Sequence, residues 1–151
     1  MHRIDTDTNG LLLIAISQSF YDYMIEEQQQ GRFIKTYKAI GEADKNNAEF
    51  LGGFPELKIN PYELSENKTI VIESFFRNYG EGLKAVRPVT EDSGMAALKK
   101  IGKKRIYATN VISINTINNS EIAVMCKISA GYRHQVRCHL AWLGLPVIGD
   151  K

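Results

Sequence analysis

Cysteine and long apolar runs are both scarce in this sequence. Two cysteines, Cys126 and Cys138, are too few for a disulfide framework or a four-ligand zinc site, so we expect a reduced, cytoplasmic setting. The longest apolar run, Leu11 to Ile16, has six residues, whereas a membrane-spanning helix needs ~20. The chain does not open with a basic leader and an apolar stretch, so we expect neither export nor a membrane partner.

The sequence also lacks the motifs of several enzyme classes. It contains no Gly-x-Gly-x-x-Gly fingerprint and no P-loop, which leaves a nucleotide cofactor without support, and no Gly-x-Ser-x-Gly elbow of a serine hydrolase. His134, Cys138 and His139 are clustered, but no matching pair elsewhere has the usual spacing of zinc ligands. We therefore expect neither a cofactor nor a bound metal.

The chain has the composition of a folded domain. Its positive charge is concentrated in one half of the sequence. Its 151 residues, 44% of them hydrophobic and 24% charged, suit a single globular domain. The formal net charge is only +2, but residues 84–139 carry ten lysines and arginines against three acids, a net of +7. Such a basic half favours a polyanionic partner, because charges act over a Debye length of ~8–10 Å. The bland alternative is that Lys99 to Arg105 form a solvated loop.

Hydrophobic periodicity and turn residues predict a strand-rich chain with two helices. The run Leu11 to Ile16 is continuously apolar and is predicted to be a buried strand. Ser17 or Ser19 can cap a helix that runs to about Gln30 and stops at Gly31. The other predicted elements are strands at 33–40, 69–76, 105–114 and 121–129, a turn at 118–120, a helix at 131–143, and loops over 41–68. This order predicts an α+β domain with a mainly antiparallel, mixed sheet and flanking helices.

Two polar stretches at the ends of the chain are the main candidates for chemistry. In the first, Asp5 to Gly10 is a turn that leads directly into the apolar run. Its side chains either bond local amides or present Asp5 to a cleft as a nucleophile or base, held ionised by a nearby cation. In the second, Arg133 and Arg137 stand four residues apart near the start of a predicted helix. They are either solvated arginines of a surface helix or an anion site for a phosphate or a buried carboxylate.

A third candidate lies on the predicted strand at 33–40. Tyr37 is two residues from Lys35, so the two side chains point to the same face of a strand. Taken alone, this pattern is typical of a half-exposed strand tyrosine. Beside an RNA site, the ring would stack on an unpaired base.

Together, these stretches resemble the three motifs of the RluA-type pseudouridine synthases, which isomerise uridine in ribosomal and transfer RNA. The first motif, His-Arg-Leu-Asp-x-x-Thr-Ser/Thr-Gly-Leu, is similar to His2 to Leu11, with Asn9 where Ser or Thr is usual. The second, Lys-x-Tyr-x-Ala, matches Lys35 to Ala39. The third, Gly-Arg-x-His-Gln-Ile/Leu-Arg-x-His with a Gly-x-Pro-Ile-x-Gly-Asp tail, is similar to Gly131 to Asp150, with Tyr132 where Arg is common.

The resemblance implies a role for each matching residue. Asp5 falls on the catalytic aspartate, Arg137 on the arginine that pairs with it, and Tyr37 on the tyrosine that packs on the uracil. Asp7 falls on a variable position. The residues implied to bind RNA or the target base are Arg3, which helps to take the base out of its helix, Val136, which lines the base pocket, and Arg133, His134, Gln135 and Lys35.

The implied activity is isomerisation of specific uridines by cleavage of the glycosidic bond and re-attachment of the uracil through C5. Asp5 would either add to C1′ or remove the C2′ proton, and the sequence does not choose between these steps. The implied partner is ribosomal or transfer RNA, with phosphate contacts from the basic half, no protein partner and no cofactor. The resemblance also implies that residues 1–151 are the catalytic core of a longer domain, whose further strands would complete the sheet.

Two alternatives use the same residues. A non-catalytic module with this fold would bind RNA through the basic half, and that binding would weaken steeply with salt. A metal-dependent hydrolase built on Asp5, Asp7 and the histidines would lose its activity to a chelator.

Overall fold

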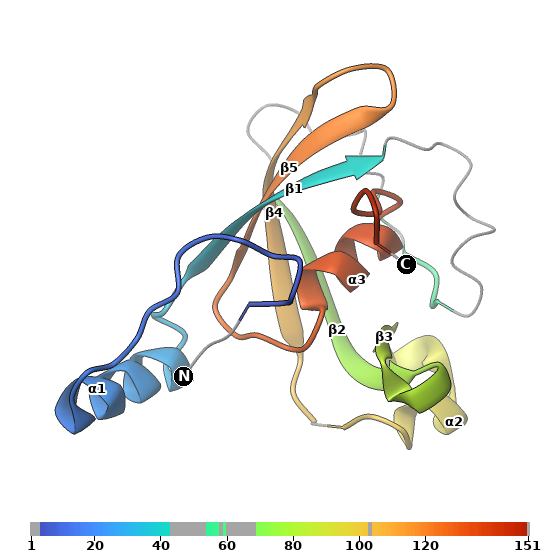
Figure 1. Ribbon diagram of the computed structural model, residues 1–151. Helices are drawn as coiled ribbons and strands as arrows, with labels where there is room; N and C mark the ends of the chain where they lie inside the picture. The colour runs from blue at the N-terminus through green and yellow to red at the C-terminus, as the bar shows by residue number, and fades with distance from the viewer. Residues whose placement is uncertain (1–3, 43–53, 58, 60–68, 103, 151) are drawn as a thin grey trace.

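A five-stranded antiparallel sheet with a helix packed against it is the centre of the computed structural model (Figure 1). The structure describes residues 4–42, 54–57, 59, 69–102 and 104–150. The strand order is β1-β5-β4-β2-β3, and each neighbouring pair is antiparallel, which confirms the predicted α+β class. Along the chain the elements are α1 (Gln18–Gln29), β1 (Lys35–Glu42), β2 (Ile70–Tyr79), η2 (Glu81–Leu83), β3 (Ala85–Val89), η3 (Glu91–Ser93), α2 (Met95–Leu98), β4 (Tyr107–Thr116), β5 (Glu121–Ile128) and α3 (Gln135–Trp142).

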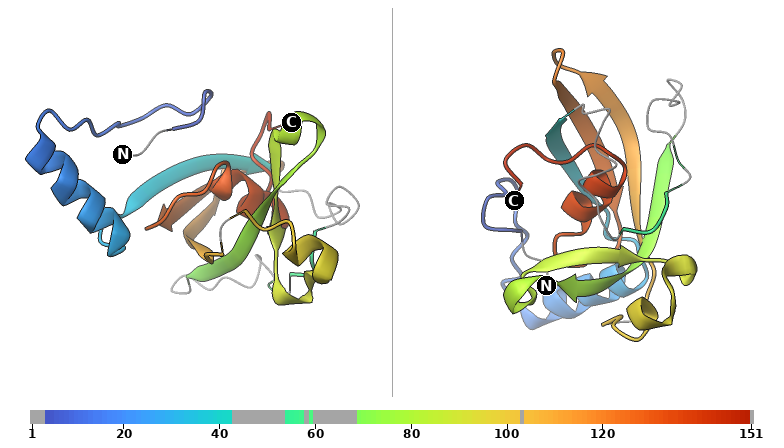
Figure 2. Two further views of the ribbon diagram at one scale, coloured as in Figure 1. Left: turned by 90° about the horizontal axis from the view of Figure 1, so that it is seen from below. Right: turned by 90° about the vertical axis from the view of Figure 1, so that its right-hand side faces the viewer.

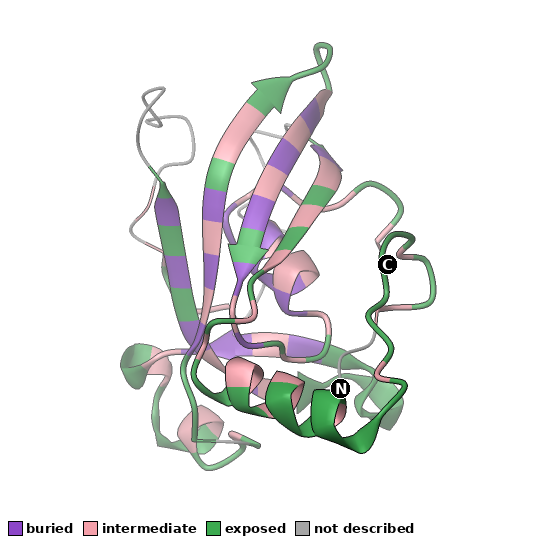
Figure 3. Ribbon diagram, turned by 90° about the vertical axis from the view of Figure 1, so that its left-hand side faces the viewer, coloured by how far each residue is buried: buried purple, intermediate pink, exposed green. Residues whose placement is uncertain are grey.

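The hydrophobic core lies between the sheet and α3. Burial alternates along β2 and β5, which Figure 3 shows as stripes on the strands, because successive strand residues face opposite sides. Leu140 of α3 is fully buried among sheet residues that include Ile72 and Val124. In a second cluster, Phe76 of β2 stacks on Tyr132 with ring centroids 4.9 Å apart. These contacts fix α3 on the sheet, together with the polar segment that precedes it.

A buried hydrogen-bond network fixes the same helix. His139 is fully buried; its Nε2 lies 2.9 Å from Ser74 Oγ on β2, and its Nδ1 lies 2.8 Å from Thr109 Oγ1 on β4. Gln135 Nε2 donates to Thr109 Oγ1 at 3.1 Å and to the Ala108 carbonyl at 2.9 Å. Buried polar groups cost free energy unless they are bonded, so this network favours a single position of α3 on the sheet.

Lowering the pH is expected to destabilise the protein through His139. Burial lowers the pKa of His139 to about 3, far below its ordinary value of 6.5. The stability contributed by neutral His139 is complete above the unfolded-state pKa and is lost as the pH falls toward the folded-state pKa. The expected slope is up to about 1.4 kcal/mol per pH unit, and urea denaturation at a series of pH values measures it.

The matched control for this prediction is His139→Asn, which does not titrate over the same pH range. We expect it to be less stable than the natural protein at neutral pH, because a bonded buried side chain is replaced by a shorter one. Its stability should nevertheless fall less steeply on acidification. An equal slope in both proteins would assign the acid sensitivity to other groups.

The predicted buried strand at Leu11 to Ile16 is wrong. These residues are not in a strand, and most of their side chains are exposed, Leu11 to 97% and Ile16 to 96%. Apolar content indicates that a segment can be buried, but it does not supply the neighbouring strand that would pair with its backbone. The segment leads instead to α1, which is capped by Ser17 as predicted and extends away from the sheet (Figures 1 and 2).

The remaining predictions differ from the structure mainly at element boundaries. The strands predicted at 33–40, 69–76, 105–114 and 121–129 correspond to β1, β2, β4 and β5. Asn118 Oδ1 accepts from the backbone N–H groups of Ser120 and Glu121, which confirms the predicted turn. The helix predicted from Gly131 begins only at Gln135. Most of the predicted loop at 41–68 lies outside the described residues, and 54–57 and 59 have no regular structure.

Four elements are not predicted: the 3-10 turns η2 and η3, the strand β3 and the helix α2. β3 contains Pro88, which argues against an interior strand, but β3 lies at the edge of the sheet, where proline is tolerated. α2 has four residues, too few to show a helical period. Among the described residues, no helix is both long and apolar enough to cross a membrane.

Candidate active site

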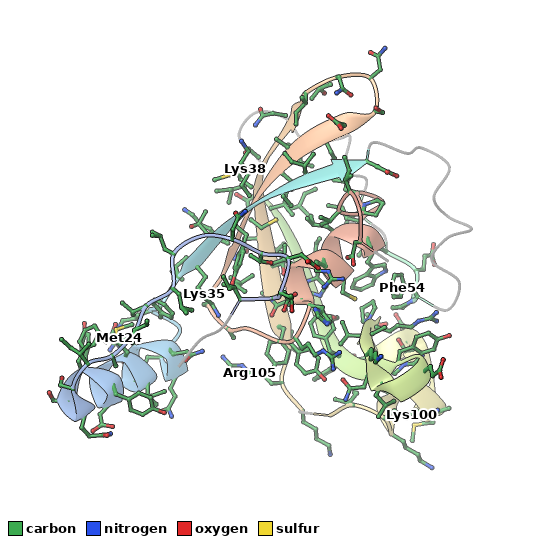
Figure 4. The ribbon with its side chains drawn as sticks, viewed as in Figure 1. Met24, Lys35, Lys38, Phe54, Lys100 and Arg105 are labelled. Carbon is green, nitrogen blue, oxygen red and sulfur yellow. The ribbon has the colours of Figure 1, made fainter. Side chains whose placement is uncertain are left out.

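A cleft of about 760 Å³ opens where the two ends of the chain meet. Its walls come from the N-terminal turn at 4–9, from β1, from the segment 131–137, and from the tail at 147–150. Lys35 and Lys38, labelled on β1 in Figure 4, both line it. Every predicted site residue that the structure describes lines this cleft, whereas Arg3 lies outside the described residues.

A tight turn presents Asp5 to the cleft. The backbone N–H of Thr8 donates to the Asp5 carbonyl at 3.0 Å and closes the turn. The Asp5 carboxylate bonds across the cleft: Oδ2 lies 2.8 Å from His134 Nδ1 and 3.5 Å from Arg137 Nη1. A backbone hydrogen bond therefore closes the turn, and Asp5 faces the cleft, where it makes the implied contact with Arg137.

The surroundings of Asp5 favour its ionised form. Burial alone would raise the pKa of Asp5, but the hydrogen bond with His134 and the positive charge of Arg137 outweigh burial, and the net effect is a lowered pKa. The side chain is still 27% exposed, so a ligand in the cleft can reach it. An ionised, partly exposed carboxylate in a cleft is able to act as a nucleophile or as a base.

Arg137 has a second carboxylate partner that the sequence reasoning misses. Its Nε donates to Asp150 Oδ2 at 2.8 Å, and its Nη2 donates to Asp150 Oδ1, which makes a bidentate pair. The hydrogen bond to Asp150 and the charges of both aspartates raise the pKa of Arg137. Asp150 closes the Gly-x-Pro-Ile-x-Gly-Asp tail, and that position is the signal that identifies it in the sequence.

The C-terminal tail is held against β1, which places Asp150. The Glu42 N–H donates to the Pro146 carbonyl at 2.9 Å, and the Ile148 N–H donates to the Ile40 carbonyl at 3.0 Å. Gly41 lies between these contacts, and a Cβ at that position would come within 3.1 Å of the Leu145 carbonyl oxygen. The glycine therefore permits the close approach of tail and strand that brings Asp150 to Arg137.

Tyr37 and Lys35 occupy the β1 wall of the cleft as the strand period predicts. Burial, and secondly the negative charge of Asp5, raise the pKa of Tyr37, so its hydroxyl stays protonated at neutral pH. Burial lowers the pKa of Lys35. The wall beside Asp5 thus combines an aromatic ring with a partly desolvated amine.

The residues of the third motif divide between the cleft and the core. Val136 lines the cleft and also packs against the core. Gln135 is only 2% exposed, and its amide is bonded inside the protein: Oε1 accepts from the Tyr132 N–H at 2.9 Å, and Nε2 donates to β4. RNA contact by Gln135 stays a prediction that would require these bonds to break. Arg133 donates to the carbonyls of Leu83 and Lys84 in the β2–β3 connection.

Potential metal ligands are dispersed in the part of the chain that the structure describes. There, no group of at least three His, Cys, Asp or Glu side chains is arranged to hold a metal ion. His139 is committed to Ser74 and Thr109, and Asp150 to Arg137. The side chains around Asp5, His134 and Arg137, instead favour a carboxylate that is ionised and acts as a nucleophile or a base.

In a comparison with known protein families, this chain matches one family over most of its length. The family described as RNA pseudouridylate synthase matches residues 1–142. RNA pseudouridine synthase 7 of Arabidopsis thaliana is 28% identical over 150 residues, which are 99% of this chain and 32% of that protein. The tRNA pseudouridine synthase C of Salmonella typhimurium is 27% identical over 151 residues, 99% of this chain and 50% of that protein. The chain thus spans about a third to a half of the length of these relatives.

A solved structure shares the fold. Human RNA Pseudouridylate Synthase Domain Containing 1 superimposes with a TM-score of 0.64 at 19% sequence identity. The match covers 99% of this chain and 52% of the human one. At this identity the likeness establishes the arrangement of helices and strands, and residue roles have to come from the site.

Proposed function

The chain belongs to the RNA pseudouridylate synthase family, and from this premise we propose that it isomerises specific uridines of ribosomal or transfer RNA to pseudouridine. The observation that carries the proposal is the Asp5 carboxylate, which lies in the cleft in contact with His134 and Arg137. Tyr37 lines the same cleft and offers a ring for the uracil.

The reaction breaks the bond between uracil N1 and ribose C1′ and makes a bond between C5 and C1′. C5 loses a proton and N1 gains one, so the atoms balance without an oxidant or a reductant. Asp5 either adds to C1′ or removes the C2′ proton, and both steps require an ionised carboxylate. The lowered pKa of Asp5 supplies that form at neutral pH.

The target base has to leave its stack before it reaches Asp5, which costs a few kcal/mol. Tyr37 and Val136 line the cleft on opposite elements, β1 and α3, and provide an aromatic and an aliphatic surface for the displaced base. Stacking of a base on an aromatic side chain offsets about 1–3 kcal/mol of such a cost. Arg3, whose implied role is to displace the base, lies outside the described residues.

Exposed cations of the basic half would bind the RNA backbone. Lys99, Lys100, Lys104 and Arg105 are exposed, and none of the four has a salt bridge to a described carboxylate. Phosphate contacts of this kind position a nucleic acid but do not select its sequence. In this proposal the basic half supplies affinity for the RNA backbone, and the cleft holds the uridine that reacts.

The test is tritium release from RNA labelled with tritium at uridine C5, followed by nucleoside analysis of the product. Mapping pseudouridines in cellular RNA with and without the gene identifies the substrate. We expect tritium release that is unaffected by a chelator and a matching yield of pseudouridine. RNA binding that weakens steeply with salt, without tritium release, would instead support a non-catalytic RNA-binding module.

A further inference from the structure

His134 adopts a backbone conformation that side chains disfavour. It precedes α3 with φ 55° and ψ 21°, in the left-handed region. Among the described residues, Leu83 is the other non-glycine residue with a positive φ, also 55°. Strained backbone persists where surrounding contacts determine it, and it is concentrated at functional sites. Arg133 contacts both strained residues, since Nη1 donates to the Leu83 carbonyl at 3.3 Å and Nε donates to His134 Nε2 at 3.0 Å.

The contact with Arg133 determines which nitrogen of His134 carries the proton. A guanidinium has N–H donors and no acceptor, so His134 Nε2 has to accept from Arg133 Nε. The proton of the neutral ring is then on Nδ1, which lies 2.8 Å from Asp5 Oδ2. His134 therefore donates its Nδ1–H to the Asp5 carboxylate.

The charged groups around the ring agree with this assignment. Asp5 faces Nδ1 from the N-terminal turn, Arg133 faces Nε2, and Arg137 Nη1 approaches Nδ1 from α3 at 3.0 Å. An acceptor beside Nδ1 and a donor beside Nε2 are what a ring with its proton on Nδ1 requires. Because Nδ1 keeps its proton for Asp5, Arg137 Nη1 does not donate to the ring, and its charge acts on Asp5 Oδ2, 3.5 Å away.

Arg133 is itself held by the β2–β3 hairpin. Its Nη1 and Nη2 donate to the consecutive carbonyls of Leu83 and Lys84, which lie between the two strands. A continuous chain of hydrogen bonds thus runs from the hairpin through Arg133 and His134 to Asp5.

We propose that Arg133 and His134 are positioning residues: Arg133, anchored on the β2–β3 hairpin, fixes the tautomer and the ring plane of His134, and His134 aims the Asp5 carboxylate at the substrate. This role replaces direct RNA contact as the main function of both residues. The proposal deepens the proposed function and rests on it for its kinetic consequence, but not for the tautomer.

The first test measures the tautomer in the free protein by ¹⁵N NMR of the His134 ring. We expect Nδ1 to carry the proton in the natural protein and the proton to move to Nε2 in Arg133→Met, because the donor to Nε2 is gone. A natural protein with the proton on Nε2 overturns the proposal, whatever the protein does to RNA. Absence of tritium release with the Nδ1–H form present would count against the proposed function alone.

The second test separates positioning from RNA binding by kinetics. Arg133→Met is expected to lower kcat about a hundredfold with little change in KM, because a small misplacement of a reacting group costs about that factor. The matched control is Arg105→Met, which removes one exposed cation of the basic half and should raise KM with kcat preserved. A rise in KM alone for Arg133→Met would make Arg133 an RNA contact and overturn the proposal.

The third test uses the strain at His134. His134→Gly is expected to keep the fold, because glycine adopts a positive φ without penalty, and yet to lower kcat, because Asp5 loses its donor. His134→Asn, which also tolerates this conformation, should keep the fold and shift the acid limb of the pH–rate profile upward. The shift follows because the hydrogen bond with His134 helps to lower the pKa of Asp5. Unchanged kcat and pH profile in both variants would leave His134 a purely structural residue and contradict the proposal.

Discussion

Asp5→Asn is expected to abolish tritium release from C5-labelled RNA, a loss of at least about a thousandfold, whereas Asp7→Asn is expected to retain it. Asparagine has nearly the shape of aspartate but can neither attack C1′ nor accept a proton from C2′. The lowered pKa of Asp5 means that the ionised form predominates at neutral pH, so the substitution removes a charge that is present. Asp7 is exposed and has no hydrogen bond or ion pair with a described residue.

The pair of variants is matched in charge and in position. Each removes one carboxylate from the same turn, so each changes the long-range attraction for RNA by the same amount. RNA binding measured at a fixed salt concentration should therefore be alike in the two proteins, and at least as tight as in the natural protein. Equal loss of tritium release in both variants would overturn the assignment of Asp5, and so would full activity of Asp5→Asn.

Local patterns predict the strands of this fold well but predict burial less well. β4 and β5 can be identified because β-rich runs are joined by a turn whose Asn118 bonds its own backbone. The apolar run at 11–16 is misassigned because burial depends on a neighbouring strand, which composition does not reveal. The burial of His139 is not predicted either, because only the tertiary structure brings Ser74 and Thr109 to its ring.

For the candidate site, the sequence predicts which residues take part but not how their side chains bond to one another. Motif resemblance selects Asp5, Tyr37 and Arg137, and the structure brings all three to one cleft. How Arg137 divides its hydrogen bonds is not predictable from spacing, because it depends on the tail folding back onto β1. The tautomer of His134 is likewise set by the β2–β3 hairpin, which is distant in sequence from the motif that it supports.

Arg137 pairs with both Asp5 and Asp150, and its substitution is predicted to have the second large effect on turnover. Arg137→Met is expected to lower kcat by about a hundredfold or more, because Asp5 loses the cation that stabilises its ionised form. Asp150 loses its bidentate partner in the same variant. Its pair with Arg137 is about one third exposed on the arginine side and screened by solvent, so the expected cost in stability is about 1 kcal/mol.

A double variant, Arg137→Met with Asp150→Asn, separates the two consequences. Removing the Asp150 charge should restore part of the lost thermal stability, since the cleft then no longer contains a carboxylate without its partner. The turnover rate should not recover, because Asp5 still lacks its cation. Asp150→Asn alone should reduce kcat only modestly, as Arg137 keeps its charge and remains able to approach Asp5. Recovery of kcat in the double variant would show that Arg137 acts by neutralising Asp150. The direct pair between Arg137 and Asp5 would then not contribute to the turnover rate.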